Sequence, residues 1–258
     1  MEVSDKLLPF IEYLSFIPHV KQKESSRISS VHSKAVFKII HPEKTGSGFL
    51  FESKSGIKGL LTCQHVLGWK QDLSNIDFRS YEIYNFKKET YPLTNIKLTN
   101  ANPIIDERLD FAFIPLCEDF IEVMKKKDIP FLKGATHFKV EDQLQIPQYA
   151  GRDVDLSVAA GFSYEIPTRH LLHHKISTEG GSSGSPLINE QGGVVGIHRG
   201  LLPTGTAEIV NLATKTEFIQ ARISGNPFNI HADVPCQCTA KSTSQAAPRM
   251  FKFSTLLV

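Results

Sequence analysis

A serine in a glycine-rich segment could carry out nucleophilic chemistry in this chain. Ser183 stands within STEGGSSGSP, residues 177–186, in the pattern Gly-x-Ser-Gly-x-Pro. Glycine permits positive φ angles and close approach of the backbone to a ligand, so such a turn can present a hydroxyl to a substrate carbonyl. A Gly/Ser-rich decapeptide is also typical of a flexible linker. Because this segment lies between two strand patterns within one series, the structured turn is the better interpretation.

A serine hydroxyl is a weak nucleophile that needs an adjacent base, and that base needs an orienting acid. His65 follows an apolar segment in LLTCQHVL, and Asp110 begins an alternating segment in RLDFAFIPL. Each alone has an ordinary explanation, since the chain has 10 histidines and aspartate is common in turns. The order His, Asp, Ser, with two members in one series of strands and the third in the next, indicates a nucleophilic site.

Short strand-like segments separated by turns must position these residues. The first series is predicted at 34–40, 47–53, 58–64, 76–86, 91–99 and 109–116. The second series is predicted at 142–150, 155–166, 170–178, 185–190, 193–200 and 206–214. This pattern is typical of small antiparallel barrels. The predicted fold is all-β, with two antiparallel six-stranded β-barrels packed side by side, a short N-terminal helix and a C-terminal helix at 215–223.

The chain divides into five predicted parts. These are a leader at 1–33 with an amphipathic helix, a first barrel at 34–118, a connector at 119–141, a second barrel with its closing helix at 142–224, and a flexible tail at 225–258. The tail lacks hydrophobic periodicity. Its last residues, FKFSTLLV, could contact a partner as an added strand or pack on the chain's own barrel.

Composition argues against several classes of function. A net charge of +2 without a dense basic stripe argues against a nucleic-acid partner. No apolar segment is long enough to span a bilayer, and the acidic start lacks the features of a secretion signal. The four cysteines are too few and unevenly spread for a disulfide framework, which favours a cytoplasmic or nuclear location. His231, Cys236 and Cys238 are possible metal ligands, but a zinc site needs a fourth ligand and wider spacing, so no metal is predicted.

The segments LTCQHVL, LDFAFIPL and GGSSGSP resemble the three active-site motifs of chymotrypsin-like serine proteases. The resemblance covers roughly residues 34–224 and implies two β-barrels with the active site between them. It implies that Ser183 is the nucleophile, His65 the general base and acid, and Asp110 the residue that orients the imidazole. The backbone N–H groups of Gly181 and Ser183 would form the oxyanion hole. Such enzymes need no cofactor.

The segment STEGGSSGSPLINEQGGVVGIHRG is similar to the corresponding region of bacterial glutamyl endopeptidases. This narrower likeness implies that Thr178 and His198 bind the side chain preceding the scissile bond. Viral cysteine proteases that cut after glutamine use a comparable Thr and His, whereas this chain has Ser183 in place of their cysteine. A hydroxyl and an imidazole can hydrogen-bond either a carboxylate or a carboxamide. Glu179 would repel an acidic side chain bound at Thr178, so the preference between Glu and Gln stays open.

The sequence therefore predicts a serine endopeptidase that acts on protein or peptide substrates through an acyl-enzyme, with a preference for Glu or Gln before the scissile bond. The alternative is a pseudoprotease or protein-interaction module that uses the same cleft for binding. The presence of all three motifs argues against the pseudoprotease.

Overall fold

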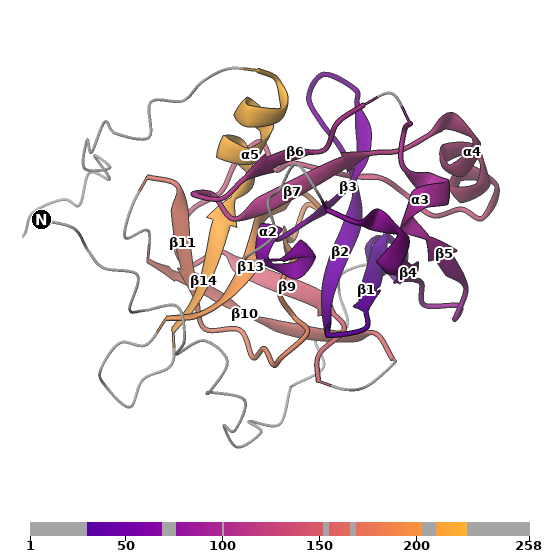
Figure 1. The fold of residues 1–258 in the computed structure, drawn as a ribbon. Coiled ribbons are helices and arrows are strands. Elements are labelled where there is room, and N and C mark those ends of the chain that lie inside the picture. Colours follow the sequence, from indigo (N-terminus) through magenta and orange to yellow (C-terminus); the bar gives the residue numbers. More distant parts are fainter. Residues whose placement is uncertain are drawn as a thin grey trace, which may run out of the picture.

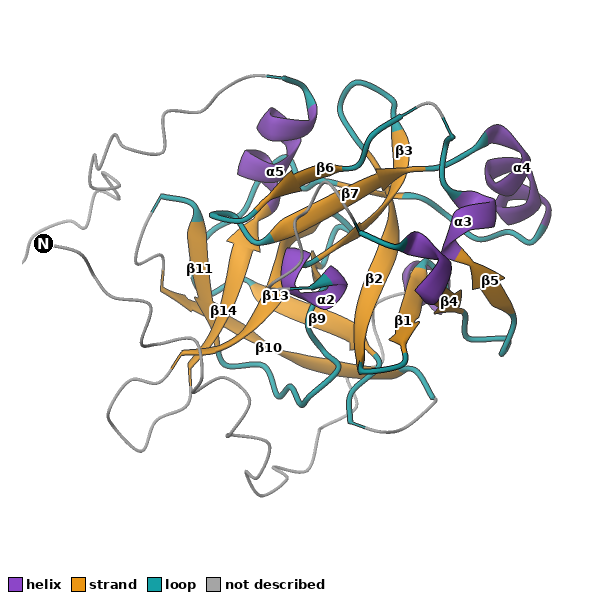
Figure 2. Ribbon diagram, viewed as in Figure 1, coloured by secondary structure: helices purple, strands orange, loops and turns teal. Residues whose placement is uncertain are grey.

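The computed structural model describes residues 30–68, 76–99, 101–151, 155–165, 169–202 and 210–225 of the chain. Two groups of strands dominate it, one from each half of the chain, with few and short helices around them (Figures 1 and 2). The predicted N-terminal amphipathic helix and the C-terminal tail lie outside the described residues, apart from a four-residue helix α1 at Ser30–Ser33. No helix in the described ranges is long and apolar enough to cross a membrane.

The first half of the chain forms an eight-stranded sheet in the order β5-β4-β1-β2-β3-β7-β6, with β8 paired to β2 off this path. Its strands are β1 Val36–His41, β2 Lys44–Glu52, β3 Lys58–Thr62, β4 Glu82–Tyr84, β5 Thr90–Pro92, β6 Ile104–Asp106, β7 Phe111–Pro115 and β8 Leu132–Lys133. Over the described residues the path does not close on itself. The predicted six-stranded first barrel is therefore an open sheet with two additional strands.

Short strands at one edge of the sheet, β4 and β5, account for part of this difference. The predicted strand at 91–99 becomes the three-residue β5 followed by helix α3, Leu93–Ile96. Pro92, the last residue of β5, has no N–H to donate to a neighbouring strand and stands at the N-cap position of the helix. The predicted strand at 76–86 is likewise divided into a 3₁₀ turn, Phe78–Ser80, and the three-residue β4. Polar and apolar residues alternate in both segments as they do in a strand, but the chain turns before it can form a long row of hydrogen bonds to a neighbouring strand.

The second half forms a closed barrel of six strands in the order β10-β11-β14-β13-β12-β9. Its strands are β9 Gln143–Gln148, β10 Ser157–Glu165, β11 Leu171–His174, β12 Pro186–Asn189, β13 Val194–Leu202 and β14 Val210–Lys215. Each overlaps one predicted segment of the second series, so the prediction of a six-stranded barrel is confirmed here. Two longer helices flank the strands, α4 at Glu118–Lys126 within the predicted connector and α5 at Thr216–Ile223.

One apolar core joins the two halves. Its largest cluster contains Phe49 and Phe51 of the sheet together with Tyr149, Ile188 and Phe218 from the barrel and α5. Leu144 and Ile146 belong to a smaller cluster that fills the barrel interior. Because the larger cluster crosses from sheet to barrel, burial of apolar surface holds the two halves against each other.

Candidate active site

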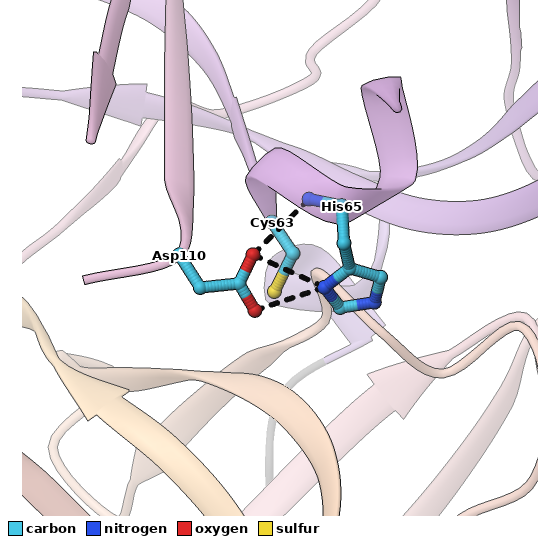
Figure 3. A group of neighbouring side chains, drawn as sticks. All are labelled: Cys63, His65 and Asp110. Carbon is cyan, nitrogen blue, oxygen red and sulfur yellow. Dashed lines mark hydrogen bonds and ion pairs between the residues drawn. The ribbon is translucent and has the colours of Figure 1, made fainter. Parts of the chain in front are cut away.

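His65 and Asp110 lie side by side because their strands are paired. His65 is in the short helix α2, Gln64–Leu67, which follows β3, and Asp110 directly precedes β7. Strands β3 and β7 run antiparallel, with Thr62 opposite Ala112, so the end of one meets the start of the other. His65 Nδ1 lies 2.8 Å from Asp110 Oδ2 and 3.1 Å from Oδ1 (Figure 3). The backbone N–H of His65 also donates to Oδ1, at 3.1 Å, so the imidazole is held with Nδ1 toward the carboxylate.

Asp110 is buried and ionised. Its backbone has a φ of +49°, in the left-handed region that aspartate tolerates better than most residues. Burial alone would raise the pKa of its carboxyl, but the hydrogen bonds from His65 and the positive charges of His65 and Arg199 outweigh burial and lower this pKa. Asp110 is therefore a carboxylate at neutral pH, suited to hold a neighbouring imidazole and to stabilise its protonated form.

Arg199 is a member of this site whose contacts with Asp110 and Ser183 sequence reasoning did not identify. It lies in β13, and its Nε donates to Asp110 Oδ2 at 3.1 Å. Its backbone carbonyl accepts the hydroxyl proton of Ser183, with 3.0 Å between the oxygens. Arg199 thus touches the acid with its side chain and the candidate nucleophile with its backbone. The only signal in the sequence was its position next to His198.

Ser183 occupies a turn between β11 and β12 that is held by the other half of the molecule. Ser47 of β2 donates its backbone N–H to the Ser183 carbonyl at 2.8 Å and its hydroxyl to the Gly181 carbonyl at 2.8 Å. Gly181 has a φ of +93°, which favours glycine. Among the hydrogen bonds of the described residues, none is donated by the backbone N–H of Gly181 or Ser183. These are the two groups predicted to bind an oxyanion.

Gly184 follows the candidate nucleophile at a close contact between the two halves. Its φ is +87°, and a Cβ atom there would lie 2.0 Å from the Ser47 carbonyl oxygen. Gly184→Ala should therefore lower the free energy of unfolding by about 2–5 kcal/mol, the sum of about 1–2 for positive φ and about 1–3 for overpacking. Urea denaturation followed by fluorescence measures this loss.

Gly56→Ala is the matched control for that variant. Gly56 has a nearly equal φ of +82°, but no atom lies within 4 Å of a Cβ placed there. Gly56→Ala should lower the free energy of unfolding only by the cost of placing alanine at a positive φ, about 1–2 kcal/mol. Equal losses in the two variants would contradict a steric role for the contact between Gly184 and Ser47.

His198 is buried and neutral. Its Nδ1 lies 3.2 Å from Nε2 of His174, and both side chains are buried. Burial, with a smaller contribution from the charge of His65, lowers the pKa of His198 to about 3. The backbone N–H of Ile176 donates to His174 Nδ1 at 3.4 Å, so the His174 proton is on Nε2 and is donated to His198. The His198 proton is therefore on its Nε2.

The hydroxyl of Thr178 already donates a hydrogen bond within the protein. Thr178 Oγ1 donates to Asn211 Oδ1 at 2.8 Å, and Asn211 Nδ2 donates to the carbonyl of Ile176 at 2.7 Å. The second bond fixes the orientation of the Asn211 amide, so its oxygen faces Thr178. Thr178 can then only accept a hydrogen bond from a ligand. Sequence reasoning did not find His174 or Asn211, since both act through partners distant in the sequence.

Among the described residues, one group of potential metal ligands is found, formed by Cys63, His65 and Asp110. It overlaps the candidate catalytic pair and adds a thiol from the residue that precedes α2. The other ligands considered from sequence, His231, Cys236 and Cys238, lie outside the described residues.

A protein-family model described as a trypsin-like peptidase domain matches residues 46–197 of this chain. A comparison with curated proteins found no match. The matched range contains His65, Asp110 and Ser183.

Several solved structures are similar in fold. An inactive form of a serine-to-alanine mutant of Rv3671c from M. tuberculosis H37Rv has a TM-score of 0.56 and 16% identity, with 81% of this chain and 96% of that chain covered. A structure reported for the binding of the disordered Sesbania mosaic virus VPg protein has a TM-score of 0.53 and 22% identity, with 72% and 88% covered. The serine protease of a human pathogenic astrovirus has a TM-score of 0.50 and 18% identity, with 74% and 95% covered. At these identities the likeness supports the fold.

Proposed function

The chain belongs to the trypsin-like peptidase family, whose model matches residues 46–197, and from this premise we propose that it is a serine endopeptidase acting through an acyl-enzyme. A peptidase domain implies protein or peptide substrates. The observation that carries the proposal is the 2.8 Å contact between His65 Nδ1 and the buried carboxylate of Asp110. It supplies an oriented base, and Arg199 connects this pair to Ser183.

In the proposed reaction, the Ser183 hydroxyl leaves the Arg199 carbonyl and gives its proton to His65 Nε2 as Oγ attacks the scissile carbonyl carbon. The carbonyl oxygen becomes an oxyanion, which the N–H groups of Gly181 and Ser183 stabilise. Asp110 stabilises the imidazolium. His65 then protonates the departing amine, and later takes a proton from the water that hydrolyses the acyl-enzyme. No step requires a metal or cofactor.

Labelling with a fluorophosphonate probe tests this proposal against the pseudoprotease alternative. The probe phosphonylates a serine that is activated by a base and accessible to a ligand, so it should modify Ser183 in the folded chain. A Ser183→Ala variant and heat-denatured protein should stay unlabelled. A folded wild-type chain that does not react would favour the alternative, a module that only binds partners.

For specificity, we propose a preference for glutamine over glutamate before the scissile bond. A neutral His198 with its proton on Nε2 is a donor, and Thr178 is an acceptor because its proton goes to Asn211. A carboxamide offers a carbonyl oxygen to the first and an N–H to the second. A carboxylate would present lone pairs to the lone pairs of Thr178. Glu179, exposed beside Thr178, adds like-charge repulsion against glutamate.

His198→Ala should lower kcat/KM on peptides with glutamine before the scissile bond by about tenfold or more, the loss of an orienting hydrogen bond of about 1.5–3 kcal/mol. Matched peptides with alanine at that position should be affected much less, because they make no such bond. Cleavage of a peptide library mainly after Phe, Leu or Arg in the wild-type enzyme would contradict this specificity.

A further inference from the structure

Cys63 places a thiol against the candidate catalytic pair. The Cys63 Sγ, a ring nitrogen of His65 and a carboxylate oxygen of Asp110 all lie within 4.8 Å of one another (Figure 3). The thiol is buried and donates to the carbonyl of His198 at 3.1 Å. None of the proposed catalytic steps uses this sulfur.

We propose that Cys63, His65 and Asp110 form an inhibitory binding site for a thiophilic divalent cation such as Zn²⁺ or Cd²⁺. A thiolate, an imidazole nitrogen and a carboxylate oxygen are donors that zinc accepts, and the sulfur selects soft cations over Mg²⁺ or Ca²⁺. Metal–ligand distances of about 2.0–2.3 Å in a tetrahedral site separate the ligand atoms by about 3.3–3.8 Å. The present spacing, from 3.1 Å between His65 Nδ1 and Asp110 Oδ1 to a limit of 4.8 Å, is near that range.

The positive charge of Arg199 and the raised pKa of the Cys63 thiol both weaken cation binding, but neither prevents it. The charge of Arg199 is 3.1 Å from Asp110 Oδ2, which leaves Oδ1 as the carboxylate oxygen for a metal. Burial raises the pKa of the Cys63 thiol, so without a metal the sulfur stays protonated and unreactive. The side chain of His65 is 15% exposed, and the cation would enter past it.

Binding at this site would stop catalysis through the imidazole tautomer. The cation takes the lone pair of His65 Nδ1, so the ring proton moves to Nε2, and Cys63 releases its thiol proton to solvent. No electron is transferred. With a proton already on Nε2, His65 cannot accept the proton of Ser183. Inhibition should lower kcat more than it changes KM, because neither the His198 imidazole nor the Thr178 hydroxyl, the groups expected to contact the substrate side chain, is a ligand of the cation.

The experiment uses the full chain with the other three cysteines replaced, as Cys117→Ser, Cys236→Ser and Cys238→Ser together, so that Cys63 is the single thiol. This protein should be inhibited by Zn²⁺ and Cd²⁺ but not by Mg²⁺ or Ca²⁺. Adding Cys63→Ser should keep peptidase activity and raise the half-inhibiting Zn²⁺ concentration by at least about 10–100-fold. Unchanged sensitivity in the Cys63→Ser protein, or no inhibition in the single-thiol protein, would overturn the proposal.

A second measurement is independent of peptidase activity, since the inhibition readout rests on the proposed function. In the single-thiol background with Ser183→Ala, Cd²⁺ should produce an ultraviolet thiolate-to-metal charge-transfer band and raise the melting temperature. Adding Cys63→Ser, or Cys63→Ala if serine prevents folding, should remove both signals. A band without any wild-type peptidase activity would keep the metal site and reject the endopeptidase. Absence of the band in folded protein would reject the metal site alone.

Discussion

Replacing Ser183 with alanine should lower kcat for peptide hydrolysis by about 10⁶-fold, the loss seen when the nucleophile of a triad is removed. The reason is local, because alanine removes the Oγ that we propose attacks the substrate, while the turn stays held by Ser47 through the carbonyls of Gly181 and Ser183. His65→Ala should cost about as much, because nucleophile and base act as one unit. Steady-state kinetics on a fluorogenic peptide, with fluorophosphonate labelling alongside, measures both variants.

Ser185→Ala is the matched control in the same turn. Its Oγ is buried and has no hydrogen-bond partner among the residues that the structure describes, so removing it should leave both activity and labelling intact. If Ser183→Ala kept activity within about tenfold of wild type, Ser183 would not be the nucleophile. If Ser185→Ala lost as much as Ser183→Ala, the effect would belong to the structure of the turn rather than to the chemistry of one hydroxyl.

Asp110→Asn should lower kcat by about 10⁴-fold without unfolding the chain. Asparagine tolerates the positive φ of this position, so the backbone can remain as it is. The amide cannot replace the carboxylate, because Oδ1 accepts the backbone N–H of His65 and Oδ2 accepts Arg199 Nε–H. Whichever oxygen becomes NH₂, a donor then faces a donor. The imidazole also loses the acceptor that fixes its tautomer.

Asp106→Asn is the matched control, because it shows whether removing a buried carboxylate elsewhere in the protein also lowers kcat. Asp106 is also buried, accepts the backbone N–H groups of Arg108 and Leu109, and is bonded by Arg222 Nε at 2.7 Å. The Asp106→Asn variant should have a lower free energy of unfolding in chemical denaturation, while its kcat stays unchanged. Circular dichroism and kinetics on both variants decide the matter. A comparable fall in kcat for the two would argue that Asp110 acts through the fold and not through His65.

Local sequence pattern predicted the barrel better than the sheet. The six segments of the second series overlap β9 to β14 because each is bounded by turns and alternates or stays apolar over its length. In the first series, Pro92 ends a segment that alternates like a strand, and the chain continues as α3. Strand β8, at Leu132–Lys133, is two residues long and depends on parallel pairing with β2, which no local pattern encodes.

In the candidate site, too, residues that stand in a short motif were found from the sequence, and residues that act through distant contacts were not. His65, Asp110 and Ser183 were found because each stands in a short pattern with its own chemistry. Arg199 was not, since its contact with Asp110 joins residues 89 positions apart. The same holds for Asn211, which reaches Thr178 across 33 positions. Short motifs in the sequence identified the three candidate catalytic residues, whereas Arg199 and Asn211 became visible only when the strands were paired.

The hydrogen bonds of Ser47 determine how the molecule unfolds around the turn that carries Ser183. It bonds Gly181 and Ser183, accepts the N–H of Tyr149 at its hydroxyl, and accepts the Thr62 hydroxyl at its carbonyl. Loops that carry catalytic groups commonly open with little free energy, independently of the rest of the protein. Here the turn cannot open without breaking bonds that also join sheet to barrel. Opening the turn that carries Ser183 must therefore also weaken the contact between sheet and barrel, so thermal inactivation should coincide with separation of the two halves.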